Sequence, residues 1–276
     1  MALRFLIIGA AKSGTTTLYD DLARHPELHL PDDKEPDILE IARDDADARE
    51  LYRRHFAKAK PGQLCGEGST FYAMLPDRKA VAAMARRVGG DAVRIVYIVR
   101  DPVERIVSHL AHDVAVARLP ADAGNLAVLN EPRFIAWSDY PMQLRQWIEA
   151  FGADRILLIR FEHYTAYRHA VASEVAAFVG ANSALLPMPG SVSNRRGSQM
   201  ALRGRWLQAL VQSRTYRFML RRLIPVALRR RTTSALSRRV DVSDVALAPE
   251  TRAMLQARFA DQEAEIAALP VRKIGF

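Results

Sequence analysis

A short loop near the amino terminus combines glycine spacing, one lysine and several hydroxyl groups in a pattern that suits anion binding. The apolar segment 5–8 leads into Gly9 and then into a run of small residues, and a helical pattern begins at Thr15. Small residues let successive backbone N–H groups converge on an anion, and the helix amino terminus directs free amides at the same point. The candidate phosphate-binding residues are Lys12, Ser13, Gly14, Thr15, Thr16 and Thr17.

The position of the lysine distinguishes this loop from a nucleoside-triphosphate loop. The pattern G-x-x-x-x-G-K-[ST] places lysine directly after the second glycine, and its Ser/Thr binds magnesium. Here Gly9 and Gly14 have the right spacing, but Thr15 takes the place of the lysine and Lys12 lies inside the loop. The pattern therefore favours a ligand other than ATP. An ordinary turn between a strand and a helix remains an alternative, because two spaced glycines are a weak motif.

The composition is that of a globular protein. The chain has 276 residues, of which 49% are hydrophobic, so it can form one domain, with or without an appendage. Cys65 is the only cysteine, which excludes an internal disulfide and favours a reducing compartment. The apolar start is short and runs straight into the loop, so we read it as a core strand rather than a signal peptide. No apolar run has the length of a membrane span. We expect a cytoplasmic protein.

The positive charge is concentrated in one segment. Residues 191–240 contain 13 arginines and no acidic residue, whereas the whole chain has a formal net charge of +9. Such a field suits phosphates, acidic or sulfated glycans, or anionic lipid headgroups, and we expect no nucleic-acid partner. Within it, segment 203–239 mixes arginines with aromatic and aliphatic residues, as in a helix lying on an anionic membrane. A helix packed on the core with its arginines in solvent fits equally well.

Strand and helix patterns alternate along the first two thirds of the chain. This order predicts right-handed βαβ units and a central, mostly parallel sheet in a three-layer, P-loop-like α/β fold, with ligands at the carboxyl edge of the strands. We expect an α/β core over residues 1–190 and an arginine-rich helical extension over 191–276 packed on the same domain. Strands are expected at 5–11, 27–30, 63–67, 94–99 and 156–161. Helices are expected at 15–25, 46–57, 77–88, 138–150, 165–179, 199–224 and 248–268, and a further helix is expected to begin at Asp101.

Further polar residues follow the strand ends. Lys34 and Glu35 lie in the turn before Pro36, Arg100 follows the strand 94–99, and Ser108 lies two turns into the next helix. Arg100 and Ser108 could bind a second phosphate, because guanidinium and hydroxyl groups are good phosphate donors. Two separate anion sites suggest a nucleotide with phosphates at two positions.

Other interpretations of these residues stay open. Glu35 could be a charge on a surface turn, and Arg100 could pair with acidic neighbours on the following helix. His109 and His112 are one turn apart and could form a base or a metal pair. No third ligand is evident from the sequence, so we favour an incidental pairing for the two histidines.

Taken together, the motifs resemble those of sulfotransferases that use 3′-phosphoadenosine 5′-phosphosulfate. Residues 12–16 are similar to the 5′-phosphosulfate loop of that family, and Arg100-Asp101-Pro102 through Ser108 resembles its 3′-phosphate motif. The resemblance covers roughly residues 4–200 and is closest to bacterial and glycan-directed members, which place a glutamate in the turn where small-molecule enzymes use a histidine. The remaining motifs in family order are Lys34-Glu35-Pro36, Gly66-Glu67-Gly68-Ser69 with Tyr72, and Arg160-Phe161-Glu162.

The resemblance implies a role for each of three site residues. Glu35 would take the proton of an acceptor hydroxyl as it attacks sulfur, Lys12 would neutralise charge on the departing oxygen, and Lys34 would assist. Sulfuryl transfer of this kind depends on in-line positioning and requires no metal. Related glycan enzymes often have a histidine two residues after the glutamate; this chain has Asp37, so no second proton relay is carried over.

The resemblance also implies a basic loop that folds over the nucleotide, with Arg195, Arg196 and Gly197 as candidate contacts. The acceptor would be a hydroxyl of a sugar, a glycolipid or a secondary metabolite, and its identity is not readable from the sequence. Two competing functions remain: a P-loop kinase or nucleotidase, against which Thr15 argues, and a non-enzymatic arginine-rich module that binds a membrane or another polyanion.

Overall fold

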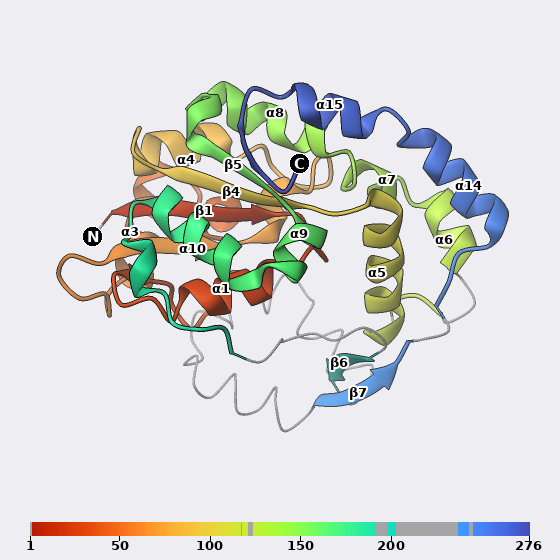
Figure 1. The fold of residues 1–276 in the computed structure, drawn as a ribbon, viewed down its shortest axis with the longest axis horizontal. Coiled ribbons are helices and arrows are strands. Elements are labelled where there is room, and N and C mark those ends of the chain that lie inside the picture. Colours follow the sequence, from red (N-terminus) through yellow and green to blue (C-terminus); the bar gives the residue numbers. More distant parts are fainter. Residues whose placement is uncertain (1, 117, 121–123, 191–197, 203–236, 243–244) are drawn as a thin grey trace.

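The computed structural model describes residues 2–116, 118–120, 124–190, 198–202, 237–242 and 245–276. Its centre is a six-stranded sheet in the order β2-β3-β1-β4-β5-β8, in which all neighbouring strands are parallel (Figure 1). The predicted α/β fold with a parallel sheet is thereby confirmed. The strands are β1 (Leu3–Gly9), β2 (Leu28–His29), β3 (Leu64–Gly68), β4 (Arg94–Val99), β5 (Ile156–Arg160) and β8 (Arg272–Ile274).

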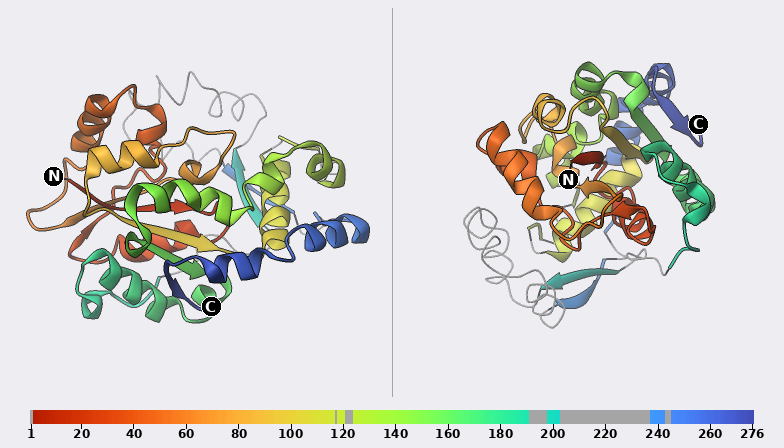
Figure 2. Two further views of the ribbon diagram at one scale, coloured as in Figure 1. Left: turned by 90° about the horizontal axis from the view of Figure 1, so that it is seen from above. Right: turned by 90° about the vertical axis from the view of Figure 1, so that its left-hand side faces the viewer.

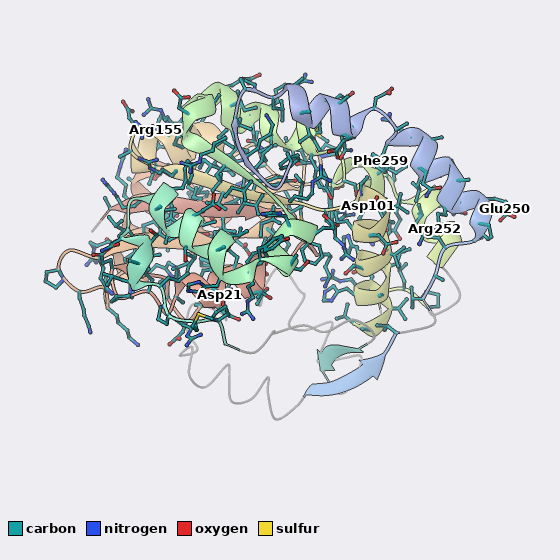
Figure 3. The ribbon with its side chains drawn as sticks, in the orientation of Figure 1. Asp21, Asp101, Arg155, Glu250, Arg252 and Phe259 are labelled. Carbon is teal, nitrogen blue, oxygen red and sulfur yellow. The ribbon has the colours of Figure 1, made fainter. Side chains whose placement is uncertain are left out.

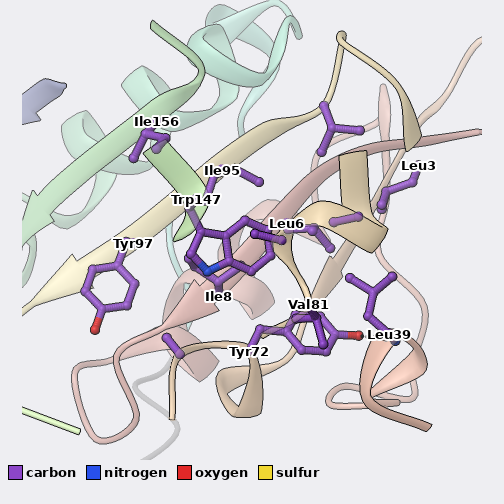
Figure 4. Packing of buried hydrophobic residues seen from close by; sticks show 14 of the residues in the cluster. Leu3, Leu6, Ile8, Leu39, Tyr72, Val81, Ile95, Tyr97, Trp147 and Ile156 are labelled. Carbon is purple, nitrogen blue, oxygen red and sulfur yellow. Dashed lines mark hydrogen bonds between the residues drawn. The ribbon is translucent and has the colours of Figure 1, made fainter. Parts of the chain in front are cut away.

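Helices cover both faces of this sheet, which explains why the central strands β1, β4 and β5 are predominantly apolar. Along β1, Leu6 and Ile8 join the core on one face, whereas Phe5 and Ile7 join the core on the other. Figure 4 shows the first face, where Trp147 packs near Leu6 and Ile8. The first face is covered by α3 (Asp45–His55), α4 (Ala82–Gly89), α8 (Tyr140–Phe151) and α15 (Gln262–Ala268), and the second by α1 (Thr15–Leu22) and α10 (Arg168–Val179) (Figure 2).

A third apolar cluster lies around α5 (Pro102–Ala115), the helix that follows β4. It includes residues of α6 (Gly124–Asn130), α7 (Arg133–Ala136) and α14 (Pro249–Arg258). Arg252 of α14 donates to Glu104 of α5 at 3.1 Å, so chain segments far apart in sequence meet at this end of the molecule (Figure 3). Other elements are α2 (Ile38–Ile41), α9 (Phe161–Ala166), the 3-10 helices η1 (Thr70–Ala73), η2 (Ala153–Arg155) and η3 (Ser183–Leu185), and the strands β6 (Ser198–Leu202) and β7 (Ser237–Asp241).

The carboxyl-terminal third differs from the sequence prediction. Residues 199–202, expected to begin a helix, belong to β6, which pairs with β7 in an antiparallel two-stranded sheet. The expected helix over 248–268 is present as two helices, α14 and α15, and β8 adds an unpredicted edge strand to the main sheet. Most of segment 203–239 lies outside the described residues. Within the part of the chain that is described, no helix combines the length and the apolarity needed to cross a membrane.

Candidate active site

The loop between β1 and α1 has the backbone shape expected of an anion-binding cradle. Gly14 has a φ of 84°, in the left-handed region that favours glycine, and caps α1. A β-carbon at this position would lie 3.0 Å from the ring of Phe161, so close packing also requires glycine. Lys12 has a φ of 69°, and the amide of Ser13 donates to the carbonyl of Ala10 at 3.2 Å. The loop therefore turns tightly before the helix begins at Thr15.

The turn that carries Lys34 and Glu35 is attached directly to this cradle. Lys34 Nζ donates to Thr16 Oγ1 at 3.1 Å and to Glu35 Oε1 at 3.2 Å. Thr70 Oγ1 donates to the same carboxyl oxygen at 3.0 Å, and the Glu35 amide donates to the carbonyl of Gly68 at 2.9 Å. The Glu35 side chain keeps 40% of its surface exposed. Glu35 thus lies at the carboxyl end of β3, beside α1, with its carboxyl group accessible.

Lys12 completes this group of charges. Burial lowers the pKa of the Lys12 ammonium to about 8, and the carboxylates of Glu35 and Asp113 oppose that shift. The structure therefore brings Lys12, Lys34, Thr16 and Glu35 to one place, from two segments that are some twenty residues apart in sequence. An ammonium of lowered pKa facing a carboxylate is a frequent feature of functional sites.

Arg100 lies against the back of the cradle. Its Nη1 donates to the carbonyl of Lys12 at 3.1 Å, and its guanidinium carbon lies 4.9 Å from the centre of the Phe161 ring. Arg100 also forms an ion pair with Glu104, with 3.9 Å between Nη2 and Oε2, which is one of the alternatives that the sequence left open. Ser108 lies half-buried on α5, two turns after Arg100.

The two histidines of α5 have different surroundings. His109 is buried and stacks on Trp137, with ring centres 5.2 Å apart, and its Nδ1 lies 3.4 Å from Arg105 Nη1. Burial, together with the charges of Arg105 and Arg133, lowers the pKa of His109 well below its usual value. His109 is therefore a neutral interior side chain, and His112 is half-buried. The described residues hold no group of three or more His, Cys, Asp or Glu side chains that could bind a metal.

One buried hydroxyl in the cradle suits an anionic ligand. Ser13 is fully buried, and its Oγ has no hydrogen-bond partner among the described residues. A buried hydroxyl without a partner is costly unless a ligand satisfies it, and phosphate oxygens accept such bonds. The residues present in the loop therefore fit a phosphate group. The predicted contacts Arg195, Arg196 and Gly197 lie outside the described residues.

Comparisons with known proteins identify the family. Residues 3–219 match the model of the sulfotransferase domain. The chain belongs to the sulfotransferase family. The crystal structure of a sulfotransferase from Alicyclobacillus acidocaldarius is similar to this sulfotransferase with a TM-score of 0.67 and 21% identity, over 99% of this chain and 98% of that chain. At that identity the likeness concerns the fold.

Two further solved structures resemble the sulfotransferase less closely. They are the sulfotransferase domain from the curacin biosynthetic pathway, with a TM-score of 0.48 and 16% identity, and that from the Synechococcus PCC 7002 olefin synthase, with 0.45 and 18%. The matches cover 69% and 68% of this chain, and 79% and 77% of theirs. A comparison with curated proteins gives no match.

Sequence reasoning overlooked two contacts within the site of this sulfotransferase. Thr70 bonds to the Glu35 carboxyl group, and the ring of Phe161 packs against both Gly14 and the Arg100 guanidinium. Both residues lie just beyond strands of the parallel sheet, Thr70 two residues after the end of β3 and Phe161 directly after β5. Their position at the carboxyl edge was therefore the available signal, because neighbouring parallel strands end at the same edge.

Proposed function

We propose that this sulfotransferase moves a sulfuryl group from 3′-phosphoadenosine 5′-phosphosulfate to a hydroxyl group of a small molecule, glycan or glycolipid. The observation that carries the proposal is the convergence of Lys12, Lys34 and Glu35 at the phosphate cradle. A base and two cations beside an anion-binding loop are what in-line transfer from a phosphosulfate requires. The nucleotide supplies the sulfuryl group, and the side chains position the acceptor and stabilise charge.

Glu35 is the proposed general base. Its carboxyl group is accessible, and the hydrogen bonds from Lys34 and Thr70 fix its orientation. A base held in this way can take the proton of an acceptor hydroxyl that approaches from solvent. Because Lys34 also bonds to Thr16 on the cradle, the base and the donor loop keep a constant separation.

Lys12 and the cradle are proposed to stabilise the leaving nucleotide. The Lys12 ammonium neutralises charge on the bridging oxygen, and the loop amides with the hydroxyls of Ser13 and residues 15–17 bind the 5′-phosphate. Arg100 and Ser108 are proposed to bind the 3′-phosphate, with Arg195, Arg196 and Gly197 contributing from the basic loop. The scheme uses these donors for charge stabilisation and requires no metal ion.

Transfer of labelled sulfur tests the function directly. The full-length protein is incubated with ³⁵S-labelled donor and fractionated cell extract, in EDTA, and each fraction is analysed for a labelled product. We expect label in a fraction that contains a hydroxyl-bearing acceptor. Failure to label any fraction, together with transfer of ³²P from γ-labelled ATP in magnesium, would replace the proposal with a kinase.

A further inference from the structure

A carboxyl group lies inside the apolar core, directly behind the turn that holds Glu35. Glu67 belongs to β3, on the same face as Cys65, and is completely buried. Burial raises the pKa of its carboxyl group. A carboxyl group in such surroundings is costly unless hydrogen bonds satisfy it. Two hydroxyls satisfy one of its oxygens: Ser69 Oγ and Tyr72 OH each donate to Glu67 Oε1 at 2.6 Å.

The same two hydroxyls accept hydrogen bonds from the backbone after Glu35. The amide of Asp37 donates to Ser69 Oγ at 3.2 Å, and the amide of Leu39 donates to Tyr72 OH at 3.0 Å. Figure 4 shows the Tyr72 hydroxyl directed toward the segment that carries Leu39. A hydroxyl has one proton and two lone pairs, so donating to Glu67 turns the lone pairs toward the amides.

The backbone that receives this support has an unfavourable conformation. Glu35 has a φ of 59° and Asp37 a φ of 56°, in the left-handed region that residues with side chains rarely adopt. Such residues persist where the surroundings over-determine them, and they are typical of functional sites. The carbonyl of Gly68, next to Glu67 in the chain, holds the Glu35 amide at 2.9 Å. Hydrogen bonds to the end of β3 and to η1 therefore hold this turn in place.

We propose that Glu67 is a positioning residue for Glu35, acting through the hydroxyls of Ser69 and Tyr72 on the backbone of residues 35–39. This inference rests on the proposed function, because it assigns Glu67 to the support of the catalytic base. The carboxyl group orients both hydroxyls as acceptors, and the held amides keep the turn in the conformation that presents Glu35 to Lys34 and the cradle. Glu67 itself does not contact the substrate.

Two substitutions separate this positioning role from simple core filling. Glu67→Gln keeps an acceptor oxygen for both hydroxyls, whereas Glu67→Met fills similar volume and has no oxygen. If Glu67 only filled space, both variants would behave alike. Under the proposal, Glu67→Gln retains the wild-type transfer rate and Glu67→Met loses about 100-fold in kcat, because small misplacements of a catalytic group are that costly.

The path from Glu67 through the two hydroxyls to the backbone of residues 35–39 is called the relay. A second pair of variants tests it while Glu67 itself is unchanged. Tyr72→Phe removes the hydroxyl that accepts from the Leu39 amide, and Tyr164→Phe removes a hydroxyl that donates to Asp21 at 2.8 Å on the other face of the sheet but keeps the ring near Gly14. Asp21 keeps its paired contacts with Arg168 in that control. We expect slower transfer from Tyr72→Phe and wild-type transfer from Tyr164→Phe, which separates the relay from the general loss of a buried tyrosine hydroxyl.

The experiment combines hydrogen exchange with transfer of labelled sulfur, on the full-length protein. Exchange is measured on the peptide that contains residues 36–41, and transfer on the extract fraction that wild type labels. We expect exchange about five- to tenfold faster in Glu67→Met and Tyr72→Phe, as for loss of one hydrogen bond, with unchanged binding of 3′-phosphoadenosine 5′-phosphate.

The outcomes distinguish this inference from the proposed function. Wild-type protein that transfers no label contradicts the proposed function, and the exchange data alone then decide whether the relay holds the turn. Wild-type transfer with equal rates and equal exchange in Glu67→Met and Tyr72→Phe overturns the positioning role of Glu67. A loss of rate that is the same in Glu67→Gln and Glu67→Met also overturns it.

Discussion

Two clusters of ionisable side chains lie near Lys12 and differ in their access to solvent. The open cluster consists of Lys34 and Glu35, whose side chains are 17% and 40% exposed. The sealed cluster consists of Arg105, His109 and Asp113 on α5, all of which are buried. Since both clusters influence the pKa of Lys12, proximity to the cradle does not by itself indicate a chemical role.

The sealed cluster uses its hydrogen bonds inside the protein. Arg105 Nε donates to Ser138 Oγ at 2.6 Å and its Nη2 to the carbonyl of Phe134 at 3.1 Å. Arg133 Nη2 donates to Asp113 at 2.7 Å. These hydrogen bonds connect α5 to α7 and to Ser138, which lies just after α7. The sealed cluster therefore has a structural role.

The open cluster differs in having a route to solvent. Lys12 in the cradle and His109 in the sealed cluster both have pKa values lowered by burial, yet of the two only Lys12 lies in the proposed phosphate-binding loop, beside an accessible carboxylate. The lowered pKa of these two groups therefore shows that they are buried. It indicates a function only where an accessible charged side chain lies beside the group. The predictions below test this distinction.

The largest expected effect is on turnover. Glu35→Gln removes the proposed base, and we expect transfer of labelled sulfur to fall by about 100- to 10,000-fold, the range for loss of general base catalysis. Calorimetry should show nearly unchanged binding of 3′-phosphoadenosine 5′-phosphate. Glu149→Gln, at an exposed site on α8, is the matched control and should transfer at the wild-type rate. Persistent turnover in Glu35→Gln would place the base elsewhere.

Disruption of the sealed cluster should affect stability instead. Arg105→Met leaves Ser138 and the Phe134 carbonyl without their buried donor, so we expect the free energy of unfolding to fall by about 3 kcal/mol. Denaturant titration measures this change. Arg145→Met, at an exposed site on α8, should change stability by less than about 0.5 kcal/mol. An Arg105→Met protein of wild-type stability would contradict the structural role.

A smaller effect is expected where Arg100 supports the cradle. Arg100→Ala removes the donor to the Lys12 carbonyl and the proposed contact with the 3′-phosphate. We expect the Kd for 3′-phosphoadenosine 5′-phosphate to rise about 10- to 100-fold, the value of a hydrogen bond to a charged group. Adenosine 5′-phosphosulfate, which has no 3′-phosphate, should lose less affinity. Equal losses of affinity for both nucleotides would indicate that Arg100 supports the cradle and does not contact the 3′-phosphate.

How far the sequence predicts the molecule differs between the two clusters. The cradle, the Glu35 turn and the strand 94–99 before Arg100 follow local patterns, and the structure has them where they were predicted. The burial of His109 depends on Trp137 and Phe134, which come from a distant segment, so no local pattern reveals it. The same reason accounts for β8, because only its pairing with β5 makes a short charged segment a strand.

The smallest expected effect is a pH dependence of nucleotide affinity. The Lys12 ammonium has a pKa of about 8 and a bound anion favours its protonated form, so affinity is constant below pH 8. Above pH 8 binding requires uptake of a proton, and affinity should fall by up to about tenfold per pH unit. Calorimetry from pH 7 to 9.5 measures the slope. Lys12→Met should remove it, and an equal slope in that variant would assign the pH dependence to another group.

Central to the proposed function is that the cradle, together with Arg100 and Ser108, binds a nucleotide with phosphates at both its 3′ and 5′ positions. Calorimetric titration of 3′-phosphoadenosine 5′-phosphate into the full-length protein, without magnesium, tests this most directly. We expect tight binding, and much weaker binding of ATP under the same conditions. Preference for ATP, or a requirement for magnesium, would contradict it.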